Sequence, residues 1–257
     1  MPSIARLHAA ARAAFFHLII SLLVGALAAA AVFGFWFPYP YQELAGGQHL
    51  FLIMVGVDVV CGPLLTAMLF SPTKSRRELT LDLSLIALVQ LAALIYGVHS
   101  ISEARPVVLA FETDRMVSVA ARQIDLADLS QAPPELQSLS WTGPVLLGTR
   151  KPNDGNEVLQ SIEMSIQGVE PSARPGWWET YEKSRPFVIQ RMKSLADLRT
   201  HRPPEKQAAI DAAVAKTGSL LENLYYLPLT SQKVLDGWIV LLNIQGQIVE
   251  YAPVDGF

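Results

Sequence analysis

The sequence contains a single cysteine, Cys61, and five histidines among its 257 residues. One cysteine can form neither an internal disulfide nor a cluster of thiolate metal ligands. The histidines are scattered and never stand at the spacing of a metal site; they are His8, His17, His49, His99 and His201. The motifs of serine hydrolases, zinc proteases, P-loop proteins and dinucleotide-binding enzymes are absent. We therefore expect no metal site, no cofactor and no enzymatic activity.

Charged residues are also scarce, at 17% of the chain, and basic residues are not in surplus. There are 20 Lys and Arg against 23 Asp and Glu, which gives a formal net charge of −3. A protein that binds nucleic acid needs a basic surplus to neutralise phosphates, so we expect no nucleic-acid partner. Hydrophobic residues instead make up 51% of the chain, and the mean hydropathy is +0.30. This apolar bias is typical of a protein with membrane lipids among its partners.

Three apolar runs reach the roughly 20 residues that a helix needs to cross a bilayer. They occupy residues 15–37, 50–70 and 79–98. Arg6 and Arg12 precede the first run as in a signal peptide, but the apolar part is too long for one. We therefore predict an N-terminal cytoplasmic tail (1–14), a three-helix transmembrane region (15–100) and a separate domain (101–257).

The placement of basic residues predicts the orientation in the membrane. Lys and Arg occur in the tail 1–14 and in the short loop 71–78, whereas the loop 38–49 has none. Loops rich in Lys and Arg stay on the cytoplasmic side, so residues 101–257 should lie outside the cytoplasm. Trp36, Tyr39 and Tyr41, with Tyr96 on the third run, would then form an aromatic belt at the outer face of the membrane.

The region after residue 100 has the pattern of an α+β domain. Alternating or β-rich runs predict strands, and proline near a helix start or glycine after a helix end marks the helices. We predict strands at 106–111, 116–121 and 143–150, helices at 156–167, 186–199 and 204–224, and a closing hairpin within 237–254. This domain is long enough to bury its own core.

The second apolar run contains an ionisable Asp58 and a helix-breaking Pro63. A charge at mid-span costs about 2.5–3.5 kcal/mol on insertion scales, so such a residue usually faces protein or water. From the rise per residue, Asp58 should lie about 18 Å from the inner face, level with Gln90 at about 16 Å and Gly25 at about 15 Å.

Gly62 and Pro63 should kink or open the helix one turn below Asp58, because proline cannot donate to the preceding turn. Gly25 would let a neighbouring helix approach closely. Two interpretations of Asp58 remain open at this stage. It is either a carboxyl bonded within the helix bundle or part of a polar notch that meets a partner.

Asp82 and His17 have simpler explanations near the inner face. The same depth estimate places Asp82 about 5 Å and His17 about 3 Å from that face. An acid in the first turn of a helix complements the helix dipole, and a histidine near the interface packs or reaches towards water. We therefore interpret both as structural, and the separation of Asp82 from Asp58 argues against a paired-acid proton relay.

The stretch GWWETY (176–181) places Trp177 and Trp178 side by side. Two adjacent tryptophans belong either to the core or to a surface patch that contacts a partner. Both interpretations remain open, and we include the two residues among the candidate partner-binding positions.

Several stretches, taken in order, resemble a known family. They are HLIISLLV (17–24), FWFPYPY (35–41), VDVVCGPLLT (57–66), the long segment 81–115 that ends in FETDR, and YLPLTSQ (226–232). In these stretches the chain resembles the type IV pilin accessory proteins of the TfpX/TfpZ group. The resemblance implies a bacterial inner-membrane protein with three transmembrane α-helices followed by an α+β periplasmic domain.

The resemblance also implies a function. Proteins of this family affect the stability, assembly or function of the major type IV pilin, so we expect an accessory factor or chaperone that binds the pilin before assembly. An unassembled pilin would offer one apolar helix, with a glutamate near its outer end, and a globular head. The candidate binding residues would be Asp58, Gly62, Pro63, Gln90, Gly25, Trp177 and Trp178. Whether the protein forms an oligomer stays open.

Two other functions are retained as alternatives. One is a membrane-anchored sensor, which would need a cytoplasmic output segment longer than the tail 1–14 or the loop 71–78. The other is a small transporter that uses Asp58, which would need a second acid at the same depth or an oligomer.

Overall fold

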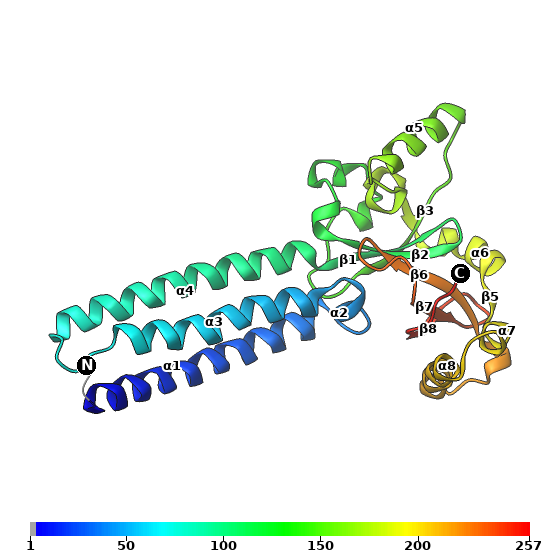
Figure 1. Ribbon diagram of the computed structural model, residues 1–257. Coiled ribbons are helices and arrows are strands. Elements are labelled where there is room, and N and C mark those ends of the chain that lie inside the picture. Colours follow the sequence, from blue (N-terminus) through cyan, green and yellow to red (C-terminus); the bar gives the residue numbers. More distant parts are fainter. Residues whose placement is uncertain (1–3) are drawn as a thin grey trace. The chain divides into compact units, whose positions relative to one another are not determined.

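The computed structural model describes residues 4–257 and divides them into two compact units (Figure 1). The first unit takes in the described residues up to Trp36, together with Gly46–Glu103. The second takes in Phe37–Ala45 and Ala104–Phe257. The chain therefore enters the second unit briefly before it returns to complete the first.

The first unit consists of three long helices that lie side by side (Figure 1). They are α1 (Ile4–Ala31), which continues into a π-helical turn η1 (Val32–Trp36), α3 (Gly47–Leu69) and α4 (Arg76–Ala104). Apolar side chains are exposed on nearly all sides of these helices, as in segments surrounded by lipid rather than water. Each helix is long and apolar enough to be a candidate membrane span.

The helices cover the three apolar runs except for Phe37 and Phe70, and each extends beyond the start of its run. The first begins at Ile4, so most of the predicted tail 1–14 is helical. Residues 1–3 of that predicted tail lie outside the described residues. Between α3 and α4 the connection is shorter than predicted, because α4 begins at Arg76.

The helices α1 and α3 form the closest pair in this unit. Gly25 of α1 is buried, and a Cβ atom placed on it would lie 3.0 Å from Cγ1 of Val55. Glycine therefore allows the close approach that was predicted for this position. The helix α4 lies farther from both, and its contacts with them run mainly through side chains.

The segment Phe37–Ala45, with the one-turn helix α2 (Tyr41–Leu44), packs into the second unit. Tyr41 is only 3% exposed and joins the core of that unit, and the Ser231 hydroxyl donates to the Leu44 carbonyl at 2.6 Å. The ring of Tyr39 packs edge-on against Trp238 with centroids 5.9 Å apart. The prediction that Tyr41 belongs to a membrane-interface belt is therefore wrong. Its ring gains more by filling a protein core than by lying at an interface.

The second unit is built on one eight-stranded mixed sheet in the order β4-β3-β1-β2-β6-β7-β8, with β5 paired to β6. Its strands are β1 (Pro106–Glu112), β2 (Arg115–Ala120), β3 (Val145–Thr149), β4 (Trp178–Thr180), β5 (Lys193–Ser194), β6 (Tyr225–Ser231), β7 (Ile239–Leu242) and β8 (Ile248–Ala252). The pairs β1–β3 and β2–β6 are parallel, and the other pairs are antiparallel.

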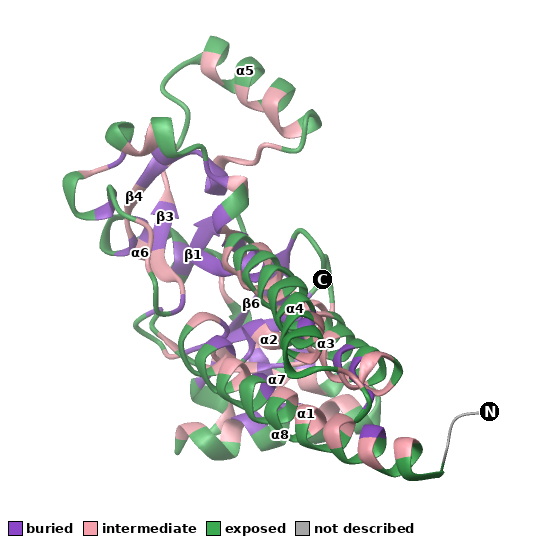
Figure 2. Cartoon of the chain, turned by 90° about the vertical axis from the view of Figure 1, so that its left-hand side faces the viewer, coloured by how far each residue is buried: buried purple, intermediate pink, exposed green. Residues whose placement is uncertain are grey.

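The predicted strands are confirmed in position and pairing. The hairpin β1–β2 turns at Thr113, and the closing hairpin β7–β8 turns at Gly246, which has a φ of +72°. Every residue of β1 and β7 is buried, as expected of strands covered on both faces (Figure 2).

The helices of the second unit agree with prediction only in part. They are α5 (Gly155–Ile166), α6 (Tyr181–Arg191), α7 (Leu195–Thr200) and α8 (Pro204–Thr217), with short 3₁₀ turns at Ala121–Gln123, Leu126–Gln131, Pro134–Leu136, Pro171–Ala173, Pro175–Trp177 and Leu221–Asn223. In α5 the Asp154 side chain caps the helix by accepting from the Glu157 amide at 2.9 Å. The end of α8 is set earlier than predicted by Gly218, whose φ is +66°.

The single helix predicted at 186–199 is wrong. Met192 is extended, and the next two residues pair as β5 with β6 before Ser194 caps α7. Pairing with a neighbouring strand therefore overrides a local helical pattern here. The helix before the break begins at Tyr181 and accommodates Pro186 in its interior.

The burial of Tyr41 predicts that a residue from the connection between two candidate spans stabilises the second unit. Tyr41→Ala should lower the free energy of unfolding by about 3 kcal/mol, because it leaves a cavity the size of an aromatic ring. Tyr39→Ala is the matched control, since Tyr39 is 50% exposed, and should cost about 1 kcal/mol or less. Pulse proteolysis of the purified full chain in detergent measures both values. Equal effects would contradict the assignment of Tyr41 to the core.

Candidate partner-binding sites

A groove of about 470 Å³ lies among the three long helices. It follows α1 from Ala13 to Gly25 and α4 from Leu83 to Leu94, and α3 contributes Val55, Asp58 and Thr66. At 1.5 Å per residue, the groove is about 16–18 Å long. Most of its lining is apolar, so it matches the side of an apolar helix better than it matches a polar solute.

A chain of hydrogen bonds links all three helices beside this groove. His17 Nδ1 lies 2.6 Å from the Thr66 hydroxyl, and His17 Nε2 lies 2.7 Å from Gln90 Oε1. The amide nitrogen of Gln90 then donates to the Asp58 carbonyl at 3.2 Å. Because an amide oxygen only accepts, the His17 ring must donate to Gln90 from Nε2.

Gly62 provides the space for this chain. A Cβ atom at this position would collide with the side-chain amide of Gln90 and lie 2.9 Å from His17 Nε2. The predicted common depth of Asp58 and Gln90 agrees with the bond between them. Gln90 reaches the Asp58 backbone carbonyl, however, and not its carboxyl.

Pro63 lies within α3, which continues as helix from Gly47 to Leu69. Proline has no N–H for the Val59 carbonyl. The neighbouring carbonyl of Asp58 is the one that receives the Gln90 amide. The polar notch predicted around Pro63 is thus filled by a side chain from α4.

The depth estimate predicted that His17 lies near Asp82, but in the structure His17 bonds to Gln90. The estimate started the first span at Phe15, where the apolar run begins, whereas α1 begins at Ile4. The helices are therefore offset along their axes, and counting from the edge of each run misplaces His17. Asp82 forms an ion pair with Lys74 at 2.5 Å. Sequence reasoning missed Thr66, although it is a lone hydroxyl in the second apolar run.

Trp177 and Trp178 lie in the second unit and have different environments. Trp178 is 4% exposed, and its indole N–H donates to the Ser172 carbonyl at 2.8 Å, so it belongs to the core and offers no surface to a partner. Trp177 is half-buried between two guanidinium groups. Cζ of Arg150 lies 4.7 Å and Cζ of Arg174 lies 5.3 Å from the centre of its ring.

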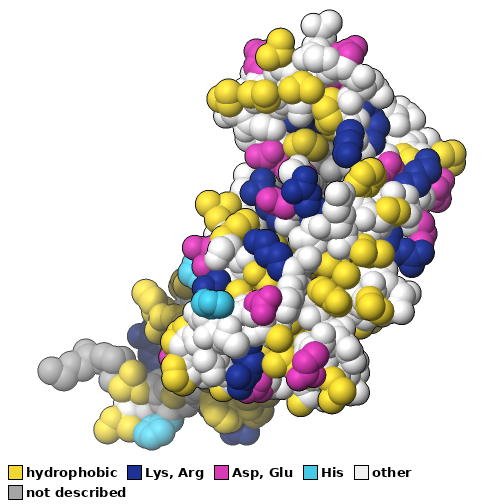
Figure 3. Space-filling model, turned by 90° about the vertical axis from the view of Figure 1, so that its right-hand side faces the viewer, with side chains coloured by type: hydrophobic (Ala, Val, Ile, Leu, Met, Phe, Trp, Pro, Cys, Tyr) yellow, Lys and Arg dark blue, Asp and Glu magenta, His cyan; other side chains and the backbone are white. Residues whose placement is uncertain are grey.

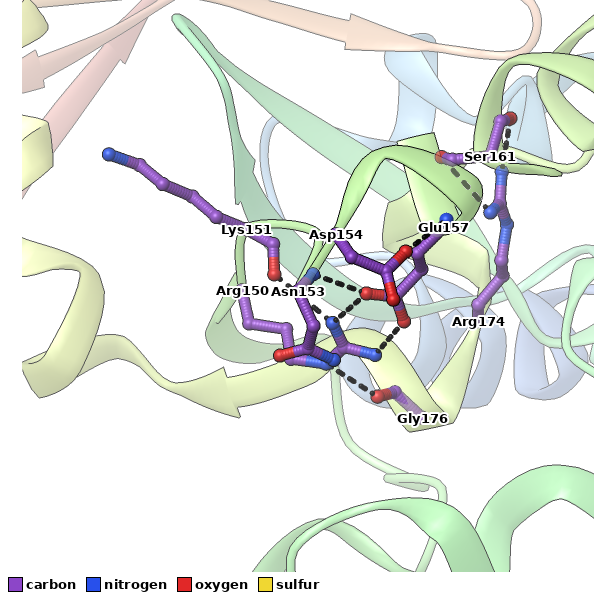
Figure 4. A network of polar contacts seen from close by, with 8 residues as sticks. All are labelled: Arg150, Lys151, Asn153, Asp154, Glu157, Ser161, Arg174 and Gly176. Atoms are coloured by element: carbon purple, nitrogen blue, oxygen red, sulfur yellow. Dashed lines mark hydrogen bonds and ion pairs between the residues drawn. The ribbon is translucent and has the colours of Figure 1, made fainter. Parts of the chain in front are cut away.

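The two arginines also hold α5 (Figure 4). Arg150 makes a bidentate pair with Glu157, with N–O distances of 2.6 and 3.0 Å. This pairing is the main cause that lowers the pKa of Glu157 from 4.5 to about 2, and Glu157 in turn raises the pKa of Arg150. Arg174 is buried, which lowers its pKa, and it donates to the Ser161 hydroxyl at 3.1 Å.

Within residues 4–257 no group of three His, Cys, Asp or Glu side chains is arranged to hold a metal ion. The candidate sites are the groove among α1, α3 and α4 and the surroundings of Trp177.

Comparison with known proteins places the chain among similar sequences. Residues 5–46 match the family described as "Fimbrial assembly protein FimB". The chain is 35% identical over 248 residues to the fimbrial assembly protein of serogroup I from Dichelobacter nodosus, with 96% of each chain covered. The serogroup E1 protein of that organism is 33% identical over the same share of both chains.

A shorter relative covers only part of the chain. The fimbrial assembly protein of serogroups C1 and C2 from Dichelobacter nodosus is 44% identical over 123 residues, which are 48% of this chain and 94% of that protein. No solved structure matches.

The hydrogen-bond chain predicts a stabilising role for Gln90. Gln90→Leu removes the partner of His17 Nε2 and the donor to the Asp58 carbonyl, and should destabilise the helical unit by about 1–2 kcal/mol. Unfolding of the full chain in bicelles measures this loss. Ser100→Ala is the control, because the Ser100 hydroxyl bonds within its own helix, to the Tyr96 carbonyl. A loss no larger than that of the control would contradict the linking role.

The lowered pKa of Glu157 predicts how α5 responds to acid. The carboxylate pairs with Arg150 only when ionised, so the contact is complete above about pH 4.5 and is lost as the pH falls through about 2. Hydrogen exchange of residues 153–168, corrected for intrinsic rates, should therefore stay slow at pH 3.5. Glu157→Gln should speed exchange at every pH, whereas Glu163→Gln should not. Acceleration of the unaltered protein already near pH 5 would contradict this pairing.

Proposed function

Because the chain belongs to the family of fimbrial assembly proteins, we propose that it is an inner-membrane accessory factor that binds the major type IV pilin before assembly. In this proposal it acts by binding rather than by catalysis, and so modulates the stability or the assembly of the pilin. This finer role is that of the TfpX/TfpZ group, which the sequence resembles. The observation that carries it is the groove among α1, α3 and α4.

The groove has the properties that a docked apolar helix requires. Its length of about 16–18 Å covers more than half of a roughly 30 Å hydrocarbon core. On α1 the lining includes the small residues Ala13, Ser21 and Gly25. Small side chains allow the backbone of a docked helix to approach closely. Because α4 is held mainly by side chains, the space beside it is not closed by helix packing.

Asp58 gives the groove a polar position. Its carboxyl belongs to the lining, and no hydrogen bond or ion pair joins it to another side chain within residues 4–257. An unpartnered carboxyl in a membrane costs about 2.5–3.5 kcal/mol on insertion scales, and a donor from a partner would offset that cost. The pilin would supply such a donor as its terminal amine or as the protonated glutamate of its helix.

The proposed topology follows from the basic residues. Arg6 and Arg12 lie near the start of α1, and Lys74, Arg76 and Arg77 lie around the connection from α3 to α4. In this proposal those ends face the cytoplasm and the second unit is periplasmic. The pilin's helix and its globular head would then meet the helical unit and the periplasmic unit, respectively.

Photocrosslinking in cells that produce the pilin tests the groove directly. A photoreactive residue at Ile20 or at Leu91, both in the groove lining, should give pilin adducts. Leu22 and Leu85 are matched controls, since they are exposed on the same helices but outside the lining, and should give none. Equal adducts from both faces, or none from the groove, would overturn the proposal.

A further inference from the structure

The helix α5 turns its apolar face outward instead of toward the core of the domain. Its apolar residues Val158, Leu159, Ile162 and Ile166 are exposed, with Leu159 at 68% and Ile166 at 82%. No residue of α5 is buried (Figure 2). An amphipathic helix on a globular domain normally turns its apolar side to the core.

The reversal is fixed by specific contacts on the polar face. Glu157 is held by the bidentate pair with Arg150, and Ser161 and Ser165 accept hydrogen bonds from Arg174. Arg174 also donates to the Val169 carbonyl just beyond the helix, at 2.6 Å. Turning the apolar stripe inward would break these charge-assisted bonds and leave the buried Arg174 without partners. The outward orientation of the apolar stripe is therefore fixed by the contacts of the polar face.

The apolar stripe continues into a groove of about 490 Å³ between α5 and α6. Its lining includes Val158 and Ile162 of α5, Phe187 of α6, and Trp177. Side chains of the hydrophobic class also gather at the top of Figure 3, where α5 lies. Apolar surface of this kind marks an interaction site on a soluble domain.

Two basic residues give the groove an unbalanced positive charge. Lys151 and Arg191 are exposed in its lining, and neither forms an ion pair within the described part of the chain. Lys151 Nζ lies 4.1 Å from the centre of the Phe187 ring, at the edge of the apolar wall. Glu112 forms an ion pair with Arg115 at 3.8 Å and Glu179 accepts from the Ser184 hydroxyl, and the lining holds three basic side chains against these two acids. The free charges therefore favour a partner with carboxylates.

We infer that the α5 groove binds the globular head of the pilin, through a segment that carries an apolar side chain next to a carboxylate. The inference rests on the proposed function and adds the surface that recognises the head. A bilayer surface is disfavoured, because the charged residues of α5 are Glu157 and Glu163, and interfacial helices carry Lys and Arg instead. This site would be separate in sequence from the groove for the pilin helix.

Photocrosslinkers at Leu159 and Ile166 test the assignment in the full-length protein in cells that produce the pilin. Both positions should give pilin adducts. Gln160 is the matched control, because it is exposed on the same helix but points away from the apolar stripe, about 100° around the helix axis from Leu159. A photocrosslinker at Gln160 should give no pilin adduct. An adduct with a second copy of this chain, or with lipid alone, would overturn the inference.

Positions Ile20 and Leu91 are probed in the same cells, so that the two proposals can fail separately. Pilin adducts from Ile20 and Leu91 but not from α5 would overturn this inference and leave the proposed function intact. Absence of pilin adducts from all four positions would overturn both.

Charge reversal tests the recognition of a carboxylate. Lys151→Glu combined with Arg191→Glu should lower the adduct yield from Leu159 at least tenfold and leave that from Leu91 unchanged. Lys151→Arg combined with Arg191→Lys keeps both charges and should retain both adducts. Both residues are exposed, so the domain should remain folded. An unchanged Leu159 yield after charge reversal would overturn the part of the inference that names a carboxylate.

Discussion

Polar groups in a helix surrounded by apolar side chains must find partners within the bundle, because nothing around the helix can replace water. His17, Thr66 and Gln90 satisfy one another in this way, and each comes from a different helix. Gly62 is what lets them meet, since any larger residue would occupy the same space. The position of α4, and with it the groove, depends on this chain of bonds more than on close backbone packing.

The fold could be predicted from the sequence where a local pattern and its tertiary setting agree. The three apolar runs and the two hairpins are of this kind, since chain composition, turn residues and burial all indicate the same element. Prediction failed at 186–199, where strand pairing to β6 interrupts a helical pattern, and at Tyr41, where a loop between helices fills a distant core. In both cases the contacting residues are far away in the sequence, so a short sequence segment considered alone cannot reveal the contact.

The candidate site shows the same limit. Depths estimated from the ends of the apolar runs correctly placed Asp58 and Gln90 at one level but misplaced His17. The shift of one helix along its axis relative to the next is set by packing, which the sequence does not show. The sequence indicated a helix at 156–167, yet a helical pattern alone says nothing of which face turns outward. That choice depends on Arg150 and Arg174, and the latter lies beyond the helix in sequence. Trp178 could be assigned to the core only once its indole partner was known.

The connection Phe37–Ala45 makes the second unit discontinuous in the chain. Tyr41 and Leu44 are made early in synthesis, whereas their core cluster also includes residues of β6 and β7 from near the end of the chain. The domain therefore cannot complete its core until translation is nearly finished, and a fragment cut at residue 104 would lack part of its interior.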